Sequence, residues 1–273
     1  MGHLTGQVAW VTGAGRGIGR AAALALAEQG AAVAVASRTQ SEVDQVATEI
    51  KSRGGRSVST MLDVSNWDMV DWAAKQIENA LGPIDVLINN AGVLEPLGRL
   101  WETDPEQWTR LIDINLSGAY YCMRTTLPGM IQHGRGVIIN ISSGAATFPA
   151  PGWSAYAASK AALDHLTRNL AVDLKGTPIP TYSLHPGIVE SRMEEALRSA
   201  TPDQLPPERR RFIVDQKESG KVLSPDVPAR AIVWMASTLC DLENGAVIDL
   251  RSQPEYLEKI DWALGAGIEP PRR

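Results

Sequence analysis

Apolar and polar positions along this chain fall into two alternating kinds of segment. Short runs such as VAWV at 8–11 contain no polar position, which is typical of strands buried on both faces of a parallel sheet. The longer segments between them carry apolar residues at helical spacing. Strand and helix in regular succession predict an α/β fold. The predicted strands cover 8–11, 31–37, 57–62, 85–89, 137–142, 180–185 and 246–250.

The helical segments predict how the chain returns from one strand to the next. The first helix ends at Gly30, since glycine often follows the last turn of a helix. Residues 190–222 are polar and proline-containing, and predict one or two helices in a mobile flap over a substrate. The tail at 251–273 is mixed, and its Pro-Pro-Arg-Arg end predicts disorder. The predicted helices cover 20–30, 40–53, 66–81, 105–133, 155–174 and 225–238.

Size and composition fit a single domain over 1–273 that includes the flap and the tail. The 273 residues lie within the range of one hydrophobic core, about 250–300 residues. A hydrophobic content of 44% and a charged content of 21% are ordinary for a soluble globular protein. The formal net charge of −5 and the absence of a long basic run speak against nucleic acid as a partner. The short ERRR cluster at 208–211 predicts a solvated helix face.

Cysteine usage and hydropathy bear on the compartment. Cys122 and Cys240 lie far apart, with neither metal-ligand spacing nor a disulfide framework, which favours a reducing compartment and no metal site. The N-terminal MGHLTGQVAW has no apolar signal core, and no apolar run reaches the length of a membrane span, about 18 residues. The expected location is the cytoplasm, without a membrane partner.

A glycine-rich turn stands between the first strand and the first helix. Residues 12–19 have the sequence TGAGRGIG, in which glycine lets the backbone approach a pyrophosphate and the helix N-terminus meets its negative charge. A tight turn without a ligand is the alternative, but the position between strand and helix favours dinucleotide binding. The candidate phosphate-binding residues are Gly13, Gly15, Arg16, Gly17, Ile18 and Gly19.

The second strand ends at Ser37 and Arg38, where an acidic residue would bind a ribose 2′-hydroxyl. No acid stands there. Arg38 and Arg16 instead bring two guanidinium groups to the place of a 2′-phosphate, and arginine binds phosphate in a bidentate manner. The pattern favours NADP(H) as the cofactor, with NAD(H) as the alternative. A merely solvent-exposed Arg38 is less expected because the acid is missing.

Further cofactor contacts are expected where later strands end, because the carboxyl ends of parallel strands share the edge at which ligands bind. Asp63 is equally expected to accept a hydrogen bond from an adenine amino group or to cap the next helix. Small residues after the fourth strand would let the backbone lie against a cofactor, or form an ordinary turn. The other candidates at these strand ends are Val64, Asn90, Ala91, Gly92, Pro186, Gly187, Val189 and Ser191.

The segment at 142–160, SSGAATFPAPGWSAYAASK, carries the candidate chemistry. Tyr156 and Lys160 lie four residues apart, on one face of a predicted helix with Ser154 as its N-cap. The helix N-terminus and the Lys160 charge are both expected to lower the pKa of the phenol, as a general acid/base at neutral pH requires. Ser143 follows a buried strand, so its hydroxyl opens into the same crevice. Tyr-x-x-x-Lys alone occurs by chance, but together with Ser143 and the glycine-rich turn it indicates function.

Asn115 stands in an otherwise apolar stretch, LIDINL, of the helical segment 105–133. A buried amide must find hydrogen-bond partners. Asn115 is therefore expected to hold a kink or to relay protons through water, and a plain buried hydrogen bond is the alternative.

Taken together, these motifs resemble the classical short-chain dehydrogenase/reductase family over roughly 5–250. The resemblance implies a doubly wound Rossmann fold, a seven-stranded parallel sheet flanked by helices, with NAD(P) across its carboxyl edge. The family usually ends its last strand with Asp-Gly-Gly, whereas here Asp249-Leu250-Arg251 leads into a longer tail. The matching motifs are T-G-x-x-x-G-x-G at 12–19, N-N-A-G at 89–92, Asn115, Ser143, Tyr156-x-x-x-Lys160 and Pro186-Gly187.

The resemblance also implies a role for each catalytic candidate. Tyr156 would exchange the proton with the carbonyl or alcohol oxygen, and Ser143 would hydrogen-bond that oxygen. Lys160 would lower the pKa of Tyr156 and bind the nicotinamide ribose. Asn115 would keep a water in the proton relay.

Cofactor preference and assembly are implied in the same way. Similar proteins with basic residues at the positions of Arg16 and Arg38 prefer NADP(H). Ser191 stands where the family often has a threonine that binds the nicotinamide carboxamide. Similar proteins are homotetramers or homodimers packed through the helices that here span about 105–133 and 154–175.

The expected reaction is reversible hydride transfer between a nicotinamide and the carbonyl carbon of a small-molecule ketone, aldehyde or alcohol. A non-redox enzyme on this fold, such as an epimerase or dehydratase, is one alternative, and a cofactor-sensing regulatory protein is another. A sensor would not need the complete catalytic set. The pocket is expected to be mostly apolar, which favours an apolar ketone or secondary alcohol, although Phe148 and Trp153 could equally be packing residues. The pocket candidates are Leu94, Glu95, Ala145, Phe148, Trp153, Ile188, Glu190 and Met193.

Overall fold

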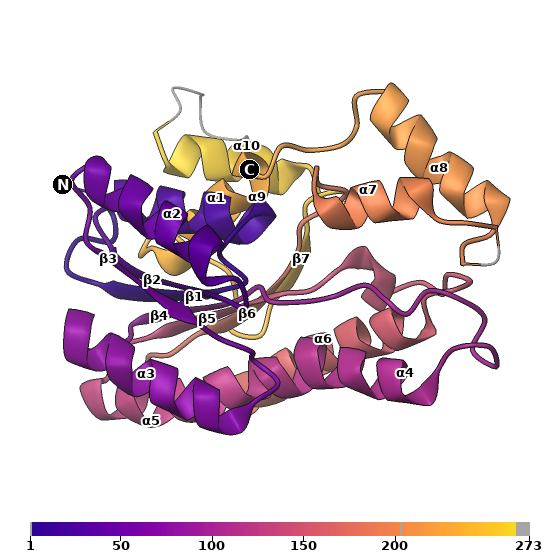
Figure 1. Cartoon of the computed structure of the whole chain (residues 1–273). Helices are drawn as coiled ribbons and strands as arrows, with labels where there is room; N and C mark the ends of the chain where they lie inside the picture. Colours follow the sequence, from indigo (N-terminus) through magenta and orange to yellow (C-terminus); the bar gives the residue numbers. More distant parts are fainter. Residues whose placement is uncertain (1, 203, 266–273) are drawn as a thin grey trace.

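The computed structural model describes residues 2–202 and 204–265, in which seven strands form one parallel sheet (Figure 1). The strand order is β3-β2-β1-β4-β5-β6-β7, so the direction of winding reverses between β1 and β4. This is the predicted doubly wound architecture. The strands are β1 (Val8–Thr12), β2 (Ala32–Ser37), β3 (Ser57–Met61), β4 (Val86–Asn89), β5 (Val137–Ile141), β6 (Thr181–His185) and β7 (Val247–Asp249).

Helices cover both faces of the sheet (Figure 1). One face carries α1 (Gly17–Glu28), α2 (Gln40–Ser52), α9 (Asp226–Ala236) and α10 (Glu255–Ala263). The opposite face carries α3 (Trp67–Leu81), α5 (Gly118–His133) and α6 (Ser154–Asp173), with α4 (Pro105–Ile112) beside α6. A separate pair, α7 (Arg192–Ser199) and α8 (Pro207–Glu218), follows β6 and stands away from both layers.

Strand β1 shows why the strands contain so few polar positions. Val8 and Trp10 point into the core under α3 and α5, while Ala9 and Val11 point into the core under α1 and α9. Both sets are buried, so successive side chains must all be apolar although they face opposite sides. These two clusters form the hydrophobic core on the two faces of the sheet, and a third cluster surrounds Tyr156 and includes Leu197 of α7 and Ile213 of α8.

Thr12 joins the ends of β1 and β4 where the winding reverses. Its hydroxyl donates to the carbonyl oxygen of Ile88 at 3.2 Å and accepts from the backbone N–H groups of Asn90 and Ala91, both at 3.1 Å. A crevice opens at such a reversal because the helices on either side leave in opposite directions. The hydroxyl of Thr12 therefore shapes the floor of the candidate site.

The structure differs from the sequence prediction in one helix and in the tail. The segment 105–133 is helical throughout, but a π-helical turn at Asp113–Ser117 interrupts it. The tail, where no element was expected, forms α10, whose Tyr256 ring lies 6.2 Å from that of Trp234. The disorder expected at 270–273 falls outside the described residues.

The flap segment 190–222 contains the two helices α7 and α8, in agreement with the predicted one or two. Its mobility stays a prediction. Within residues 2–202 and 204–265, no helix is both long enough and apolar enough to cross a bilayer.

A line of buried polar side chains ties α6 to the centre of the sheet. The Asn140 side chain accepts from the Asn89 amide at 2.8 Å and donates to the Thr167 hydroxyl at 2.9 Å. All three residues are almost fully buried. Buried polar groups of this kind are stabilising only when they are paired, because an unpaired one keeps its full desolvation cost.

We expect Asn140→Ala to lower the free energy of unfolding by about 2–4 kcal/mol, because it leaves the Asn89 amide and the Thr167 hydroxyl without their partner and opens a small cavity. Urea unfolding followed by circular dichroism measures this loss. Asn79→Ala, at an exposed position of α3, is the matched control and should change stability by less than about 0.5 kcal/mol. Equal losses in the two variants would contradict the role of the network.

Candidate active site

Tyr156 and Lys160 lie one turn apart on the buried face of α6, with 7% and 4% of their surfaces exposed. The Lys160 Nζ is 5.8 Å from the centre of the Tyr156 ring and donates a 2.7 Å hydrogen bond to the carbonyl oxygen of Ile141 in β5. The prediction that Ser154 caps this helix is wrong. Trp153 holds the N-cap position, and no side chain caps the helix, which begins at Ser154 itself.

Burial decides the pKa of both groups. It raises the pKa of the Tyr156 phenol, and the hydrogen bond with the Ser143 hydroxyl offsets this only in part. The predicted lowering of this pKa is therefore wrong for the protein alone, because desolvation of a phenolate outweighs the other influences. Burial also lowers the pKa of Lys160 to about 8, against the opposing charge of Asp164.

Ser143 lies two residues beyond the carboxyl end of β5. It caps a short 3-10 helix at Gly144–Ala146, and its Oγ accepts from the backbone N–H of Ala145 at 3.2 Å. That bond fixes the oxygen beside the Tyr156 phenol, so the hydroxyl hydrogen is donated to the phenol oxygen in the protein alone and can turn to a substrate oxygen in the cavity.

Asn115 acts behind the cavity. Its Oδ1 accepts from the N–H of Val93 at 2.8 Å, and its Nδ2 donates to the carbonyl oxygen of Val93 at 2.9 Å and to the Ser159 hydroxyl at 3.2 Å. Because Asn115 lies in the π-helical turn, these bonds hold the interrupted helix against the loop after β4. These are the buried hydrogen bonds of the alternative prediction, and the expected kink stays a prediction. The expected water relay stays a prediction.

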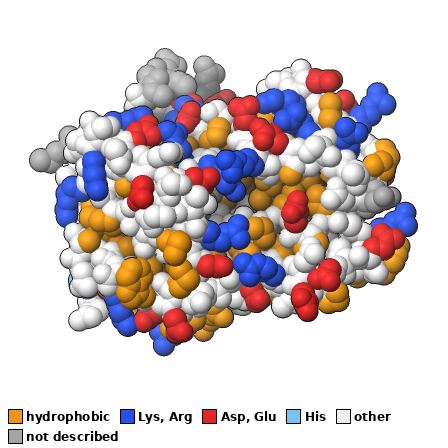
Figure 2. All heavy atoms as spheres, in the orientation of Figure 1, with side chains coloured by type: hydrophobic (Ala, Val, Ile, Leu, Met, Phe, Trp, Pro, Cys, Tyr) orange, Lys and Arg blue, Asp and Glu red, His pale blue; other side chains and the backbone are white. Residues whose placement is uncertain are grey.

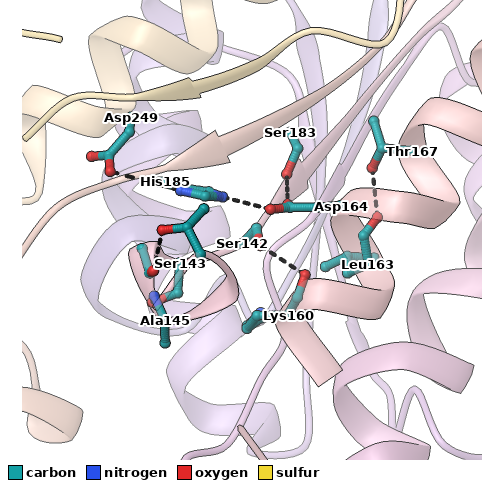
Figure 3. Close-up of polar contacts among 12 residues, drawn as sticks. Ser142, Ser143, Ala145, Lys160, Leu163, Asp164, Thr167, Ser183, His185 and Asp249 are labelled. Atoms are coloured by element: carbon teal, nitrogen blue, oxygen red, sulfur yellow. Dashed lines mark hydrogen bonds and ion pairs between the residues drawn. The ribbon is translucent and has the colours of Figure 1, made fainter. Parts of the chain in front are cut away.

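A buried row of polar side chains lies behind Lys160 (Figure 3). Asp164, one turn further along α6, accepts from the Ser183 hydroxyl at 2.6 Å and lies 2.8 Å from the Nε2 of His185. A carboxylate only accepts, so this ring nitrogen carries the proton. The Nδ1 of His185 faces Asp249 at 3.8 Å. Burial alone would raise the pKa of Asp164, but the hydrogen bonds from His185 and Ser183 hold it below its usual value. Asp164 is therefore an anion near the Lys160 ammonium.

One cavity of about 620 Å³ runs along the carboxyl edge of the sheet. Ser143, Tyr156 and Lys160 line it, as do all the predicted cofactor residues except Gly19. Of the predicted pocket residues, Glu95 does not line it, whereas the other seven do. Those seven are Leu94, Ala145, Phe148, Trp153, Ile188, Glu190 and Met193.

The glycine-rich turn fits a pyrophosphate. Among the first residues of α1 there is no acid, and no side chain caps its N-terminus, so the first N–H groups are open to an anion in the cavity. Gly13 has a φ of 63° and lies so close to Ala91 that a Cβ would come within 2.9 Å of its backbone. Gly19 packs behind this turn, where a Cβ would come within 2.4 Å of the Gly13 oxygen. These observations fit a bound dinucleotide.

The end of the cavity near β2 contains an acid that the sequence did not indicate. Glu42, in the first turn of α2, pairs with Arg16 at 3.2 Å and lies 3.6 Å from Arg192 of the flap. Arg38 and Asp63 also line this end. Asp63 accepts from Ser65, while Asn66 caps α3, so the alternative that Asp63 caps this helix is wrong.

The opposite end of the cavity also holds residues without a sequence signal. Arg209, Phe212 and Arg251 line it. The prediction that 208–211 forms a solvated helix face is wrong for Arg209, because its guanidinium lies among three aromatic rings. Phe212, three residues further along α8, was the available sign that one side of this helix turns inward.

The comparison with protein families shows to which family the chain belongs. The model of the short chain dehydrogenase family matches residues 7–202. The chain belongs to the short-chain dehydrogenase family. Its sheet and flanking helices are therefore the Rossmann fold of that family, and its members are oxidoreductases that use NAD(P)(H). Within the described residues, no group of three or more His, Cys, Asp or Glu side chains could hold a metal ion.

Similar proteins cover nearly the whole chain. A short chain dehydrogenase of Pseudocercospora fijiensis is 34% identical over 270 residues, which span 95% of this chain and 86% of the relative. The 3-oxoacyl-[acyl-carrier-protein] reductase of Thermotoga maritima is 30% identical over 248 residues, with 91% and 97% covered. Among solved structures, a putative NAD(P)-dependent gluconate 5-dehydrogenase from Beutenbergia cavernae with bound NADP is 32% identical and superposes with a TM-score of 0.81, covering 90% of this chain and 96% of that one.

The buried Lys160 of this dehydrogenase makes its stability depend on pH. Between about pH 8 and pH 10.5 the folded protein binds fewer protons at this site than the unfolded chain, so stability rises with pH there. We expect Lys160→Met to remove that rise. Without nucleotide, the free energy of unfolding of the variant, taken relative to that of the wild type, should fall by about 3 kcal/mol from pH 8 to pH 10.5.

Urea unfolding at several pH values measures this difference. Lys75→Met removes a side chain that is 65% exposed and should follow the wild-type pH dependence. Parallel curves for the wild type and Lys160→Met would show that Lys160 titrates normally.

Proposed function

We propose that this dehydrogenase interconverts a carbonyl compound and an alcohol with NADP(H). The observation that carries the proposal is the meeting of Ser143, Tyr156 and Lys160 at the centre of one cavity, between the glycine-rich turn and an apolar pocket. The relative from Thermotoga maritima, named as a 3-oxoacyl carrier-protein reductase, supports reduction of a carbonyl group.

In the direction of reduction, the Tyr156 hydroxyl gives its proton to the oxygen of the substrate carbonyl. The bound cofactor supplies the hydride for the carbonyl carbon. The Ser143 hydroxyl donates a hydrogen bond to the same oxygen and stabilises the negative charge that develops on it. The Lys160 ammonium, protonated at neutral pH, stabilises the phenolate that Tyr156 leaves behind.

Asn115 and the acidic row act through other residues. The bonds from Asn115 to Val93 hold the loop after β4 beside Lys160, so the nicotinamide end of the cavity keeps its shape. Asp164 supports the positive charge of Lys160 and so supports the phenolate indirectly. Asn115 and Asp164 are positioning residues.

The preference for NADP(H) rests on Arg16 and Arg38. Both line the end of the cavity where β2 terminates, and β2 ends there without an acid. Glu42 acts against this preference, because it pairs with Arg16 in the protein alone. Arg16 can serve a 2′-phosphate only if its guanidinium leaves Glu42, which makes Arg38 the main determinant.

We propose further that the protein works as a homodimer or homotetramer in the cytoplasm. Tyr120 of α5 and Val172 of α6 are 48% and 72% exposed, so both helices have an apolar side chain available for such a contact. The thiols of Cys122 and Cys240 are free, as a reducing compartment keeps them.

We expect Tyr156→Phe to lower kcat by about 10²–10⁴-fold, because it removes the only proton donor proposed for the carbonyl oxygen. Binding of NADPH, followed by its fluorescence, should stay within about twofold of the wild type. Tyr256→Phe, which removes a phenol hydroxyl from α10, is the matched control and should keep full activity. Near-normal turnover by Tyr156→Phe would overturn the mechanism.

We expect faster oxidation of NADPH than of NADH across a panel of ketones, aldehydes and acyl thioesters, followed by absorbance. Arg38→Ala should raise the KM for NADPH by about tenfold or more, because the variant loses a charge-assisted hydrogen bond to the 2′-phosphate. The KM for NADH should stay nearly unchanged, because NADH carries no 2′-phosphate. Arg56→Ala is the control, since this arginine is exposed and does not line the cavity. Equal use of NADH by the wild type would overturn the cofactor preference and leave the mechanism intact.

A further inference from the structure

The pocket end of the cavity contains a guanidinium surrounded by aromatic rings. The Arg209 Cζ lies 4.8 Å from the centre of the Trp153 ring, 5.0 Å from Phe212 and 5.3 Å from Phe148. We call these four residues the arginine cage. All four line the cavity, and α8 of the flap supplies two of them. Aromatic rings attract the charge but offer little to its N–H donors, so the guanidinium keeps its hydrogen-bonding capacity.

A second guanidinium stands beside the cage. The Arg251 Cζ lies 5.2 Å from the same Phe212 ring, and this residue also lines the cavity. Burial and the neighbouring Arg251 charge lower the pKa of Arg209, as expected for two cations held close together. Repulsion between them is relieved when an anion binds between them.

Neither arginine has an anionic partner within the described residues. No carboxylate of 2–202 or 204–265 lies within ion-pair distance of Arg209 or Arg251, and the buried Nε of Arg209 has no hydrogen-bond acceptor there. An unpaired buried donor costs free energy, which a bound acceptor recovers. Within the described residues, the pocket thus presents one guanidinium with an unpaired buried donor and, beside it, the exposed guanidinium of Arg251.

Among the described residues, none of the acids that line the cavity forms an ion pair with Arg209 or Arg251. Glu190 pairs with Lys217, and the buried Glu194 lies 2.7 Å from the Nε of Arg198, although neither Glu194 oxygen makes a hydrogen bond. Asp249 accepts from the backbone N–H of Arg251 with one oxygen and faces His185 with the other.

The cage lies close to the reacting groups. The Trp153 ring contacts the guanidinium of Arg209 and also packs edge-on against the Tyr156 ring, with centroids 5.9 Å apart. The Trp153 ring therefore stands between the Arg209 guanidinium and the Tyr156 ring that carries the proton donor. A molecule with its carbonyl at Tyr156 would lay a short apolar segment along Trp153 and bring its far end to the arginines.

Figure 2 shows the surroundings of this site in the intact surface. Hydrophobic atoms line a hollow between the α7–α8 lobe and the body of the molecule, and both basic and acidic side chains stand around it. The cavity is thus open to a small molecule that is apolar along its length and negatively charged at one end.

We propose that the substrate is an oxo acid or hydroxy acid, whose carboxylate binds Arg209 and Arg251 while its carbonyl or alcohol group meets Ser143 and Tyr156. This rests on the proposed function of the enzyme. The planar guanidinium matches a carboxylate through paired hydrogen bonds, and the aromatic walls accept the apolar segment between the two ends. The alternative is that Arg209 only fastens the flap to Trp153 and Phe148 by packing. A packing role would give no preference for charged substrates.

The test compares phenyl ketones that carry a carboxylate with their methyl esters. The pairs are 4-oxo-4-phenylbutanoate, 5-oxo-5-phenylpentanoate and 6-oxo-6-phenylhexanoate, each beside its ester. In the wild type, at least one acid should exceed its ester in kcat/KM by about tenfold or more, the worth of a charge-assisted hydrogen bond. Arg209→Met and Arg251→Met should each lower kcat/KM for the acid and leave kcat/KM for the ester unchanged. The ratio should then fall close to one.

Arg211→Met is the matched control, because it removes the same charge from α8 at an exposed position that does not line the cavity. It should keep the wild-type preference. Equal rates for acid and ester in the wild type would overturn the proposal and leave carbonyl reduction standing. A preference that survives both Arg209→Met and Arg251→Met would overturn it as well.

Calorimetry separates this proposal from the proposed function, because it needs no turnover. We expect 4-phenylbutanoate to bind the NADP⁺-saturated enzyme at least about tenfold more tightly than 4-phenylbutanamide, and Arg209→Met to abolish the difference. If no carbonyl compound is reduced but this difference is present, the reaction is wrong and the anion site stands. Equal binding of acid and amide would overturn the site.

Discussion

The hydrogen bond from the Lys160 ammonium to the carbonyl oxygen of Ile141 joins helix α6 to strand β5 at the centre of the molecule. Ser142 strengthens the junction by donating to the backbone oxygen of Lys160. Tyr156 lies on the same face of α6, so its distance from Ser143 at the end of β5 depends on this junction. A charged group buried at this point would be costly without its partners, and Asp164 supplies the opposite charge. The packing of α6 against β5 therefore also sets the catalytic geometry.

The parallel sheet supplies the other constraint. All seven strands end at the same edge, so the glycine-rich turn after β1, the loop after β4 and the turns after β5 and β6 meet although they lie far apart in the sequence. The reversal of strand order between β1 and β4 opens the crevice, and Thr12 fastens its floor. The cavity follows from the topology, and local side chains only refine its chemistry.

The strands could be predicted because burial on both faces leaves them without polar positions, and most helices because one buried face imposes a period on the sequence. The central residues of the site could be predicted because a glycine-rich turn and a Tyr-x-x-x-Lys pair have fixed spacing. What the sequence did not indicate depends on distant contacts. Glu42 and Arg209 look like solvent-exposed helix positions until α2 and α8 are placed over the cavity. The pKa of Tyr156 was predicted in the wrong direction because spacing reveals a neighbouring charge but not the depth of burial.

The two functional parts of the cavity belong to different parts of the fold, and this affects how the enzyme can evolve. The proton-transfer groups are built into the rigid interior, on β5 and α6, whereas much of the arginine cage belongs to α8, a surface helix outside both layers. Substitutions at the cavity-lining positions of α8, other than the buried Ile213, can exchange the molecule that is recognised while β5 and α6 stay unchanged. Selection can therefore assign new metabolites to an unchanged reaction centre, and a laboratory that wishes to redirect this catalyst should randomise α8 first.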